Sequence, residues 1–483
     1  MAVEQGIPEQ DLPERCIPER IEAGTGRAEA GTGEAEAGAR THEAGTGPAR
    51  ADPATHQARV AGRPGSLSRV HTLLFAVAAG VAVAGVYLAQ PLLVTMGHDL
   101  GLAPGTVGVV VALTQVGYGL GLFLLVPLGD LVDRRRLIVT QFGLLAVALA
   151  AVGLAGHAAL LLVAMIGVGL LAVVTQAVVA YAAALAAPAE RGGVVGAVTS
   201  GVVIGILLAR TVSGTVADLA GWRAVYLGAA ALVLALAGTL YRVLPRAHDH
   251  RASATGVAPP SYRRLLVSTP TLFLEERLFR VRALFALLIF ASFSTLWSSI
   301  ALPLSEPPLS LSHSAIGAFG LAGAAGALGA IPAGRLSDRG HANRVTGIAL
   351  LLLTLSWLPL AFTRQSLWAL MVGTIVLDLA VQAVHVTNQT LIHPLRPDAG
   401  SRLIGGYMIF YSIGSAGGAI ASTTLYAAAG WPAVCLLGAA FGALALVVWA
   451  VDSRGKRGED DTPPEPAVTP STSTSATSSR NSA

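Results

Sequence analysis

The chain has 483 residues, of which 53% are apolar and only 12% charged, and its mean hydropathy of +0.64 is too high for an ordinary soluble protein. Its single lysine, Lys456, precedes an arginine, so no Walker phosphate loop exists and we expect no use of ATP. The two cysteines, Cys16 and Cys435, exclude a disulfide framework and a cysteine metal site. Without an H-E-x-x-H motif or a cysteine–histidine cluster, we expect neither a metal nor an enzyme. Composition thus predicts a polytopic membrane protein.

Residues 1–69 are rich in glycine, alanine and charged side chains. The sequence EAGTG begins there at Glu22, Glu29 and Glu43. The stretch lacks the short apolar core of a cleavable signal peptide. We therefore predict a disordered N-terminal tail.

Twelve apolar segments follow the tail. Most reach the ~20 residues that an α-helix needs to cross a ~30 Å hydrocarbon layer. The first six lie near 72–96, 106–128, 137–155, 158–187, 193–217 and 222–243, and the second six near 281–301, 314–336, 345–363, 366–390, 403–427 and 431–451.

A long arginine-rich stretch divides these segments into two sets of six. The end of the chain turns to proline, serine and threonine, which cannot bury enough apolar surface to fold alone. We expect a six-helix bundle at 70–245, a cytoplasmic linker at 246–280, a second six-helix bundle at 281–451 and a disordered tail at 452–483.

Arginine placement predicts the orientation. If the N-terminus is cytoplasmic, only Arg223 and Arg364 lie in outside loops. The positive-inside rule then places both termini in the cytoplasm, and the net charge of +4 needs no nucleic acid to explain it. The inside arginines are Arg134, Arg135, Arg136, Arg191, Arg335, Arg339, Arg344, Arg396 and Arg402, together with those of the linker.

The two sets of segments repeat each other. "PLGDLVDRRR" after the second segment has a counterpart, "PAGRLSDRG", after the eighth. "GWRAVY" at Gly221 likewise matches "GWPAVC" at Gly430. Two matches at nearly one offset indicate related halves, as secondary transporters have.

From about Leu73 to Val451 the chain resembles the major facilitator superfamily. The wording "YLAQPLL" at Tyr87 and "SGVVIGILLARTVSG" at Ser200 is similar to bacterial drug and sugar efflux permeases. The resemblance implies an all-α membrane protein, with twelve transmembrane helices in two pseudo-symmetric bundles, that transports by alternating access. Its best marker is the family's G-x-x-x-D-[RK] loop with trailing basic residues, which Gly129, Asp133, Arg134, Arg135 and Arg136 match.

Two departures weaken export by analogy with that family. Its drug–proton antiporters usually carry an arginine in helix 4, whereas the segment from Leu160 has none. Their helix 5 includes a Gly-Pro pair, where this sequence has Ala209 and Arg210.

The loop motif has two interpretations. Asp133 and the arginines after it could form a conformational gate, or the arginines could only fix topology. We favour the gate because Gly334, Asp338 and Arg339 repeat the arrangement.

Small residues recur at every fourth position of the fifth and eighth predicted segments, near 193–217 and 314–336. This spacing allows close packing of helices in lipid. The family fold would put these helices at the junction of the two halves, and packing without functional specificity is equally acceptable. The stripes include Gly201, Gly205, Gly326 and Ala330.

The tenth predicted segment, near 366–390, carries a polar stripe. A charge inside a membrane helix is costly and usually faces a cavity or a partner. Asp378 could approach Arg210 of helix 5 in one conformational state, or each could be satisfied locally. His385 can change charge near neutral pH, so the stripe could conduct protons, or the histidine could only be hydrogen-bonded. The stripe comprises Asp378, Gln382, His385 and Gln389, with Asn388 beside it.

Polar residues of other helices indicate a central cavity, although each alone could serve as an interhelical hydrogen bond. They include Tyr87, Gln90, Gln115, Tyr118, Gln176 and Trp297. We therefore expect a proton-coupled secondary transporter of the plasma membrane that exports a small organic molecule, such as a drug, sugar or metabolite. Symport uptake and a non-transporting membrane sensor are the alternatives. We expect a monomer that contacts lipid and a small-molecule substrate, uses the proton gradient, and needs no cofactor, nucleic acid or ATP.

Overall fold

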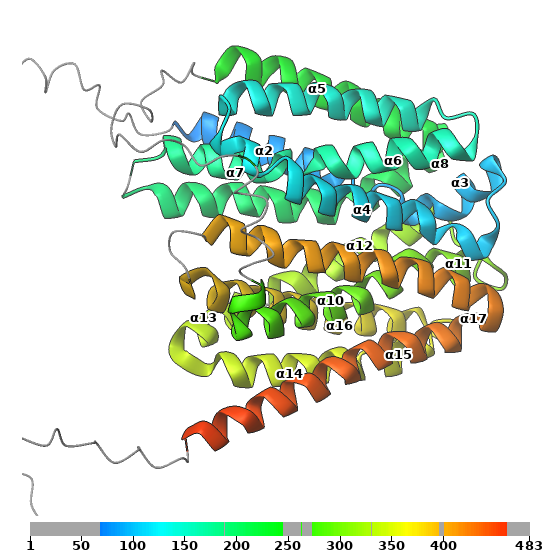
Figure 1. Ribbon diagram of the computed structural model, residues 1–483. Helices are drawn as coiled ribbons and strands as arrows, with labels where there is room; N and C mark the ends of the chain where they lie inside the picture. The colour runs from blue at the N-terminus through cyan, green and yellow to red at the C-terminus, as the bar shows by residue number, and fades with distance from the viewer. Residues whose placement is uncertain are drawn as a thin grey trace, which may run out of the picture. The chain divides into compact units, whose positions relative to one another are not determined.

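The computed structural model describes residues 68–187, 189–244, 262, 273–329, 331–395 and 400–460. Most of the predicted tails and linker lies outside these residues, as does Ala330. The described part is helical, as expected, and its helices lie side by side along a common direction (Figure 1).

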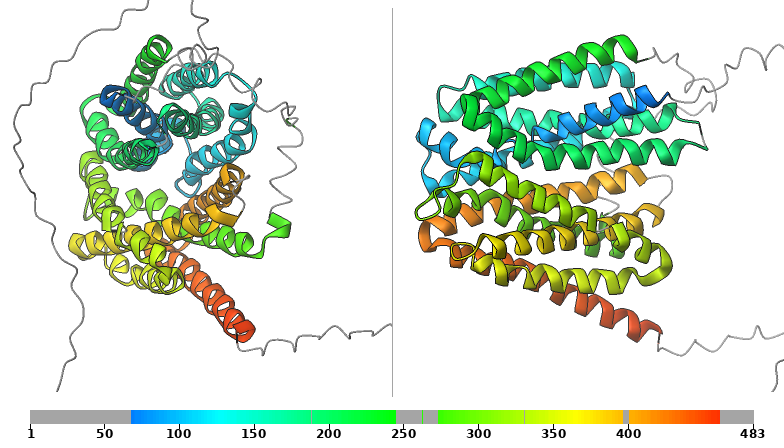
Figure 2. Two further views of the ribbon diagram at one scale, coloured as in Figure 1. Left: turned by 90° about the vertical axis from the view of Figure 1, so that its left-hand side faces the viewer. Right: turned by 180° about the vertical axis from the view of Figure 1, so that it is seen from behind.

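The first half of the helices belongs to residues 69–243. They are drawn from blue to green in Figures 1 and 2. Their bounds are α2 Arg69–Ala84, η1 Gln90–Leu92, α3 Leu93–Leu100, α4 Gly108–Leu124, α5 Arg134–Gly153, α6 Ala158–Ala172, α7 Val174–Leu185 and α8 Arg191–Val243.

The second half of the helices belongs to residues 277–460, and it repeats the alternating directions of the first (Figure 2). Its bounds are α10 Arg277–Ser299, α11 Ala301–Ser305, α12 His313–Gly329, α13 Ile331–Leu336, η4 Ser337–His341, α14 Ala342–Leu355, α15 Trp357–Ala361, α16 Leu367–Ile392 and α17 Gly400–Asp460.

Three glycines divide the longest helical runs. Gly221, Gly340 and Gly430 have φ angles of 82°, 86° and 72°, a left-handed conformation that is cheap only for glycine. Eight described segments are long and apolar enough to cross a membrane, and the three longest of them each contain one of these glycines. Counting those three as pairs, and adding the N-terminal segment that begins with α2, gives the twelve predicted spans in the described part of the chain.

The two GW motifs form the same kind of turn. Gly221 and Gly430 each reverse the chain, and the indole that follows each anchors the next helix. Trp222 donates a hydrogen bond to Asp99 at 2.9 Å, and Trp431 donates to the carbonyl of Leu360 at 2.8 Å. The sequence repeat therefore corresponds to a repeat of backbone geometry.

The helix ends gather into two groups. The arginine-rich end carries the starts of α2, α5 and α10, and it lies at the left of Figure 1. The opposite end carries the turns at Gly101, Gly221 and Gly430. Its two arginines are both paired, Arg223 with Asp99 at 3.1 Å and Arg364 with Glu306 at 2.8 Å.

Two helices extend beyond the predicted bundle boundaries. α10 begins at Arg277 rather than near 281, and α17 continues to Asp460 rather than ending near 451. Arg277 lies 3.5 Å from Asp452, so an ion pair joins the two extensions. Composition cannot show this contact, because it brings together residues from opposite ends of the second half.

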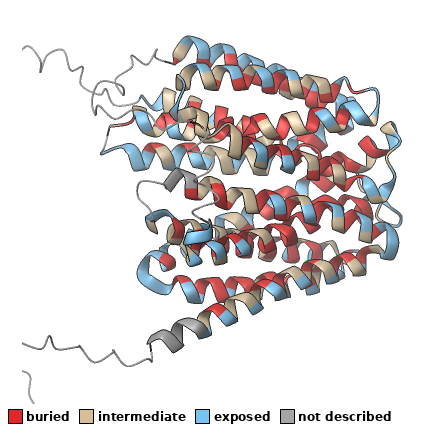
Figure 3. Cartoon of the chain, viewed as in Figure 1, coloured by how far each residue is buried: buried red, intermediate tan, exposed pale blue. Residues whose placement is uncertain are grey.

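The helices are buried on one side and exposed on the other (Figure 3). Large apolar residues such as Val147, Val163 and Leu234 are each at least 60% exposed. Such surfaces are typical of helices that face lipid. Lipid tails are as apolar as these side chains, so burying the outer faces would gain no hydrophobic free energy.

The small-residue stripes bring helices together within each half. The backbone of Gly201 and Gly205 in α8 packs against Ala76 and Gly80 of α2, so closely that a β-carbon would overlap the facing carbonyl. Gly326 of α12 packs in the same way on Ile375 of α16. The expected junction between the halves therefore forms elsewhere along α8 and α12, beside Gly214 and Gly317.

Candidate functional site

Arg210 is a buried cation near the middle of the bundle. Its Nε donates a hydrogen bond of 2.5 Å to Gln90 Oε1. Three aromatic rings surround its guanidinium carbon, with the centroid of Trp297 at 3.9 Å, Tyr87 at 5.3 Å and Phe293 at 5.7 Å. Attraction to the ring faces compensates part of the cost of burying the charge.

A break in the first helix places Tyr87 and Gln90. α2 ends at Ala84, and the chain makes turns before η1 begins at Gln90. Pro91 has no N–H and cannot continue an α-helical hydrogen-bond ladder. Such irregular backbone is tolerated inside a membrane where it is buried in protein or lines a cavity.

Asp378 is a buried acid on α16. Trp297 Nε1 donates to its Oδ1 at 3.4 Å, and its Oδ2 has no hydrogen-bond partner. Gly323 of α12 faces Oδ2 so closely that a β-carbon would overlap it. The carboxyl group therefore depends on a neighbour with no side chain.

Arg210 and Asp378 form no ion pair in this conformation. Trp297 lies between them, with its ring face toward Arg210 and its N–H toward Asp378. Gly317 and Gly320 of α12 also pack against Arg210. A direct approach in another conformational state remains a prediction.

Aromatic residues continue the polar centre toward His385. The Tyr87 and Tyr411 hydroxyls lie 2.6 Å apart and join the two halves. The ring of Phe290 lies 4.1 Å from that of Tyr411 and 5.1 Å from that of His385, between centroids. No hydrogen bond crosses Phe290, so the polar chain is interrupted there.

His385 is surrounded by hydrogen-bonding side chains. Its Nδ1 lies 3.0 Å from the Tyr407 hydroxyl, and its Nε2 lies 3.2 Å from Gln389 Nε2. Asn388 Nδ2 donates to the same Tyr407 hydroxyl at 3.4 Å. Two residues of the expected stripe, His385 and Gln389, thus join Asn388 and Tyr407 in a local network. Gln382 is half-buried, and Asp378 contacts Trp297 instead.

Arg282 is a second buried arginine, which the sequence analysis missed. Its guanidinium donates at 3.3 Å to both Thr346 and Asn388, and its Nε has no partner. The available signal was a cation inside the predicted segment near 281–301, but the sequence analysis did not single it out. Tyr407 and Tyr411 were missed because an isolated tyrosine in an apolar helix carries no pattern.

The remaining predicted polar residues lie around Tyr411. The rings of Tyr118 and Tyr411 are 6.3 Å apart between centroids, and Gln176 is a hydrogen-bonding neighbour of Tyr118. Gln115 is buried, and its Oε1 has no hydrogen-bond partner.

The two copies of the loop motif differ in geometry. Asp133 is the N-cap of α5 and accepts from the Arg136 N–H at 2.9 Å. Arg134 donates to the carbonyl of Gly129 at 3.0 Å, and Arg135 stacks on Tyr241 and donates to its carbonyl. These contacts all lie within the first half.

The second copy of the motif makes no matching cap. Asp338 and Arg339 are exposed in the π-helical turn of η4. A β-carbon placed on Gly334 would lie 3.3 Å from the Val386 side chain. α14 has His341 at its N-cap position, with no side-chain hydrogen bond. The repeated sequence therefore does not form a repeated cap, and the gate interpretation stays a prediction.

Hydrogen bonds join the two halves at the end opposite to the arginines. Asp218 of α8 accepts from the backbone N–H groups of His313 and Ser314 at 3.1 and 2.8 Å, and its Oδ1 lies 2.7 Å from His313 Nδ1. His313 Nε2 in turn lies 2.6 Å from Thr95 Oγ1. An acid of one half therefore caps α12 of the other.

α17 also meets the first half at that end. Thr423 and Thr424 both donate to the carbonyl of Gly105, at 3.3 and 3.2 Å. Together with the Asp218 contacts, these bonds close the bundle at this end in the conformation observed.

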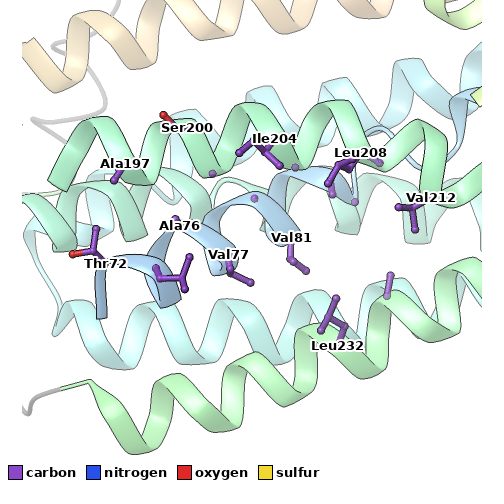
Figure 4. A pocket seen from close by; sticks show the side chains of 18 of the residues that line it. Thr72, Ala76, Val77, Val81, Ala197, Ser200, Ile204, Leu208, Val212 and Leu232 are labelled. Carbon is purple, nitrogen blue, oxygen red and sulfur yellow. The ribbon is translucent and has the colours of Figure 1, made fainter. Parts of the chain in front are cut away.

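Two cavities open beside the helices. One of about 1230 Å³ is an apolar groove between α2 and the two arms of α8, shown in Figure 4 with Val77, Ile204 and Leu232 among its walls. The other, of about 560 Å³, lies between α4 and α17 and reaches Gln115. No cluster of metal-binding side chains occurs in the described residues.

Comparison with known proteins places this architecture among transporters. The sequence model described as Major Facilitator Superfamily matches residues 75–323 and 283–480. The "Uncharacterized transporter YgaY" of Escherichia coli O157:H7 is 45% identical over 383 residues, which cover 79% of this chain and 95% of that protein. "Probable transporter SCO4007" of Streptomyces coelicolor is 32% identical over 396 residues, covering 81% and 89%.

The fold is also similar to solved structures. A bacterial homologue of the human lysosomal transporter Spinster, in an inward-facing and unoccupied conformation, has a TM-score of 0.65 and 15% identity, and the match covers 81% of this chain and 98% of that one. At this identity the likeness concerns the fold alone.

Proposed function

The chain belongs to the Major Facilitator Superfamily and is a membrane transporter, and we propose that it exports a small organic molecule in exchange for protons. The observation that carries this proposal is the contact series from Arg210 through Trp297 to Asp378. It joins one helix of the first half to two helices of the second at the centre of the bundle.

Asp378 is the proposed proton-binding group. A carboxylate in the membrane interior costs free energy unless it is paired, and proton uptake removes its charge. Its free Oδ2 supports this role, because a proton can bind there without breaking the contact of Oδ1 with Trp297. Moving one charge through 100 mV supplies about 2.3 kcal/mol, which is enough for modest concentrative transport.

Arg210 is the residue that we propose responds to the charge of Asp378. Its contacts with Gln90 and Tyr87 belong to the first half, and those with Trp297 and Phe293 belong to the second. When Asp378 is charged, Arg210 is attracted toward the second half, and when Asp378 is neutral this attraction is lost. Protonation of Asp378 can therefore change the contacts between the two halves.

Alternating access requires the end contacts to open in turn. In the observed conformation, the bonds from Asp218 to His313 and from Thr423 to Gly105 close the end opposite to the arginines. We propose that this is the extracellular end. The paired state of Arg223 and Arg364 supports this orientation, because it leaves the net positive charge at the other, cytoplasmic end.

We further propose that both termini are cytoplasmic, that the protein works in the plasma membrane as a monomer, and that the proton gradient rather than ATP drives it. The absence of a Walker lysine supports the energy source. Proton conduction along the His385 network is a second part of the proposal, although Phe290 separates that network from Tyr411.

Everted membrane vesicles with a proton gradient test the coupling. A panel of sugars, nucleosides and cationic dyes is added while internal pH is followed. We expect one class of compound to release protons, and Asp378→Asn to abolish this release while substrate still exchanges across the membrane by counterflow. Asp99→Asn is the matched control, since Asp99 lies outside the membrane centre. Proton release by Asp378→Asn equal to that of the parent would overturn the assignment.

A further inference from the structure

His313 connects three helices at the end of the bundle opposite to the arginines. It is the first residue of α12, which belongs to the second half. Its Nδ1 lies 2.7 Å from Asp218 Oδ1 of α8, and its Nε2 lies 2.6 Å from Thr95 Oγ1 of α3, both in the first half. The backbone of Gly214 packs on the His313 carbonyl so closely that a β-carbon would overlap it. The imidazole can therefore keep these contacts only while the two halves stay together at this end.

The surroundings of Asp218 favour its ionised form. It accepts hydrogen bonds from the backbone N–H groups of His313 and Ser314 at 3.1 and 2.8 Å, and the Ser314 hydroxyl also donates to it. A carboxylate can accept all of these bonds, and the dipole at the N-terminus of α12 favours a negative charge there. Asp218 therefore places a negative charge beside the His313 ring.

Both protonation states of His313 fit these contacts. A neutral imidazole can donate from Nδ1 to Asp218 and accept at Nε2 from the Thr95 hydroxyl, whereas an imidazolium donates from both nitrogens. Protonation thus adds a positive charge beside the carboxylate without breaking a contact. The side chains of His313 and Asp218 are 29% and 26% exposed, so protons can reach them from water.

The other charged groups around His313 do not join the two halves at this end. Arg210, on the same helix as Asp218, lies about two turns away from it. The remaining ion pairs at this end of the described chain each stay within one half. They are Asp99 with Arg223 at 3.1 Å and with His98 at 3.8 Å in the first half, and Glu306 with Arg364 at 2.8 Å in the second.

We infer that His313 and Asp218 form a proton-sensitive latch, in which a proton on His313 favours closure of the end opposite to the arginines. The protonated ring meets the carboxylate only when this end is closed. Closure therefore increases the proton affinity of the ring, and by linkage acid favours closure. Histidine suits this role because it is the side chain that ordinarily changes charge between about pH 5 and 8.

The latch adds regulation to the proposed exchange, and its extracellular placement rests on the orientation proposed above. In that exchange, the outward-open conformation releases the exported molecule and takes up a proton. Acid outside the cell then favours the return step by closing this end. At alkaline pH the neutral imidazole keeps its hydrogen bonds but lacks the added charge, so closure is weaker.

Pulsed electron paramagnetic resonance between two spin labels measures closure directly. The labels are attached to Gly156→Cys of the first half and Gln365→Cys of the second, in a Cys16→Ser background, since both positions are exposed in turns at this end. The buried Cys435 should stay unlabelled. The full chain is placed in lipid nanodiscs, where no gradient exists. We expect the ratio of short, closed distances to long, open distances to rise from about pH 8 to about pH 5, where histidine ordinarily gains its charge.

Variants of the latch isolate its share of this rise. His313→Gln keeps hydrogen-bonding groups but cannot become charged, and Asp218→Asn removes the carboxylate. In each variant we expect the rise to be about two- to fivefold smaller than in the parent, the range that a partly exposed ion pair supplies. His98→Gln is the matched control, because His98 is exposed at the same end and pairs only with Asp99 of its own half, so the rise should equal that of the parent.

The titration of every other group is common to the parent and the variants, so the comparison concerns the latch alone. Thermal unfolding shows whether each variant folds, and Asp218→Asn probes the contact from the other half if His313→Gln is unstable. Either folded variant with the pH dependence of the parent would overturn the inference, as would an equal loss in His98→Gln. These measurements use no substrate, so their failure is distinct from a failure of proton release in vesicles.

Discussion

The guanidinium carbon of Arg210 lies 3.9 Å from the ring centroid of Trp297, whose N–H points to Asp378. One indole therefore contacts a buried cation through its face and a buried acid through its edge. In this conformation the indole lies between the two groups, which form no direct ion pair.

Substitution of Trp297 should separate its two contacts. Trp297→Phe keeps an aromatic face for Arg210 but loses the N–H, whereas Trp297→Leu loses both. Because a desolvated cation–π contact contributes about 2 kcal/mol, we expect Trp297→Leu to lower thermal stability more than Trp297→Phe does. Both variants should lower proton-coupled transport about tenfold or more, the factor that about 1.4 kcal/mol produces.

The stability comparison uses scanning fluorimetry in detergent, and transport uses the vesicle assay. Trp357→Phe is the control, because the indole N–H of the buried Trp357 donates to Ser292 and not to Asp378. If Trp297→Phe transports and releases protons like the parent, the N–H to Asp378 has no part in coupling.

Gly323→Ala tests the dependence of Asp378 on a missing side chain. A β-carbon at Gly323 would overlap Asp378 Oδ2, so the carboxyl group must move or the helices must separate. We expect transport to fall at least tenfold, with a loss of stability of about 1–3 kcal/mol from overpacking. Counterflow and thermal unfolding measure the two effects.

Gly417→Ala serves as the control for that variant. Nothing lies within 4 Å of a β-carbon at Gly417, which also sits in a long membrane helix. Equal transport by the two alanine variants would show that α16 tolerates a displaced Asp378.

Asp99 should make stability depend on pH. The Trp222 N–H and Arg223 hold the pKa of this carboxyl group below its ordinary value of 3.8. A depressed pKa in the folded state means that the carboxylate stabilises the fold above pH 3.8, and that this contribution is lost as the pH falls through the lower folded value. Asp99→Asn should therefore lower the melting temperature at pH 7, and the difference from the parent should shrink as the pH falls below 3.8.

Melting temperatures measured between pH 7 and the lowest tolerated pH provide the readout. The exposed Asp338, for which no partner is seen in the described residues, is the control position, and Asp338→Asn should change little at any pH. A constant difference between Asp99→Asn and the parent across the range would contradict the linkage.

Single cysteines test the proposed orientation. Gly156 lies in the turn before α6, and Gly192 lies at the start of α8, and both have open space around the position of a β-carbon. In a Cys16→Ser background, Gly156→Cys should react with an impermeant maleimide in intact cells, and Gly192→Cys only after permeabilisation. The buried Cys435 should stay unlabelled in both. The reverse pattern would place the termini outside.

Sequence patterns found most of the fold because membrane helices follow local rules. Apolar length set the spans, and the GW repeat located the turns at Gly221 and Gly430. The same patterns located Asp378 and Arg210, since a charge in an apolar helix is conspicuous. They could not assign partners to these charges, because Trp297 is 81 residues from Asp378 in the chain and has no spacing that links them.

The stripes of small residues also predicted close packing without identifying the packing partner. The stripe of α8 indicates close packing, but only the assembled helices decide that Gly201 faces α2 and not the other half. Arg282, Tyr407 and Tyr411 escaped detection for the same reason. Their importance lies in neighbours contributed by other helices.

The sequence by itself determined that this chain is a membrane transporter with two related halves, because hydropathy, internal repeats and family motifs are properties read along one dimension. Only the tertiary structure decided that an indole stands between Arg210 and Asp378, that Asp218 caps α12 across the halves, and that Gln115 is left with a free acceptor. These features depend on how helices approach in space, where single contacts of a few ångströms settle which polar groups are satisfied.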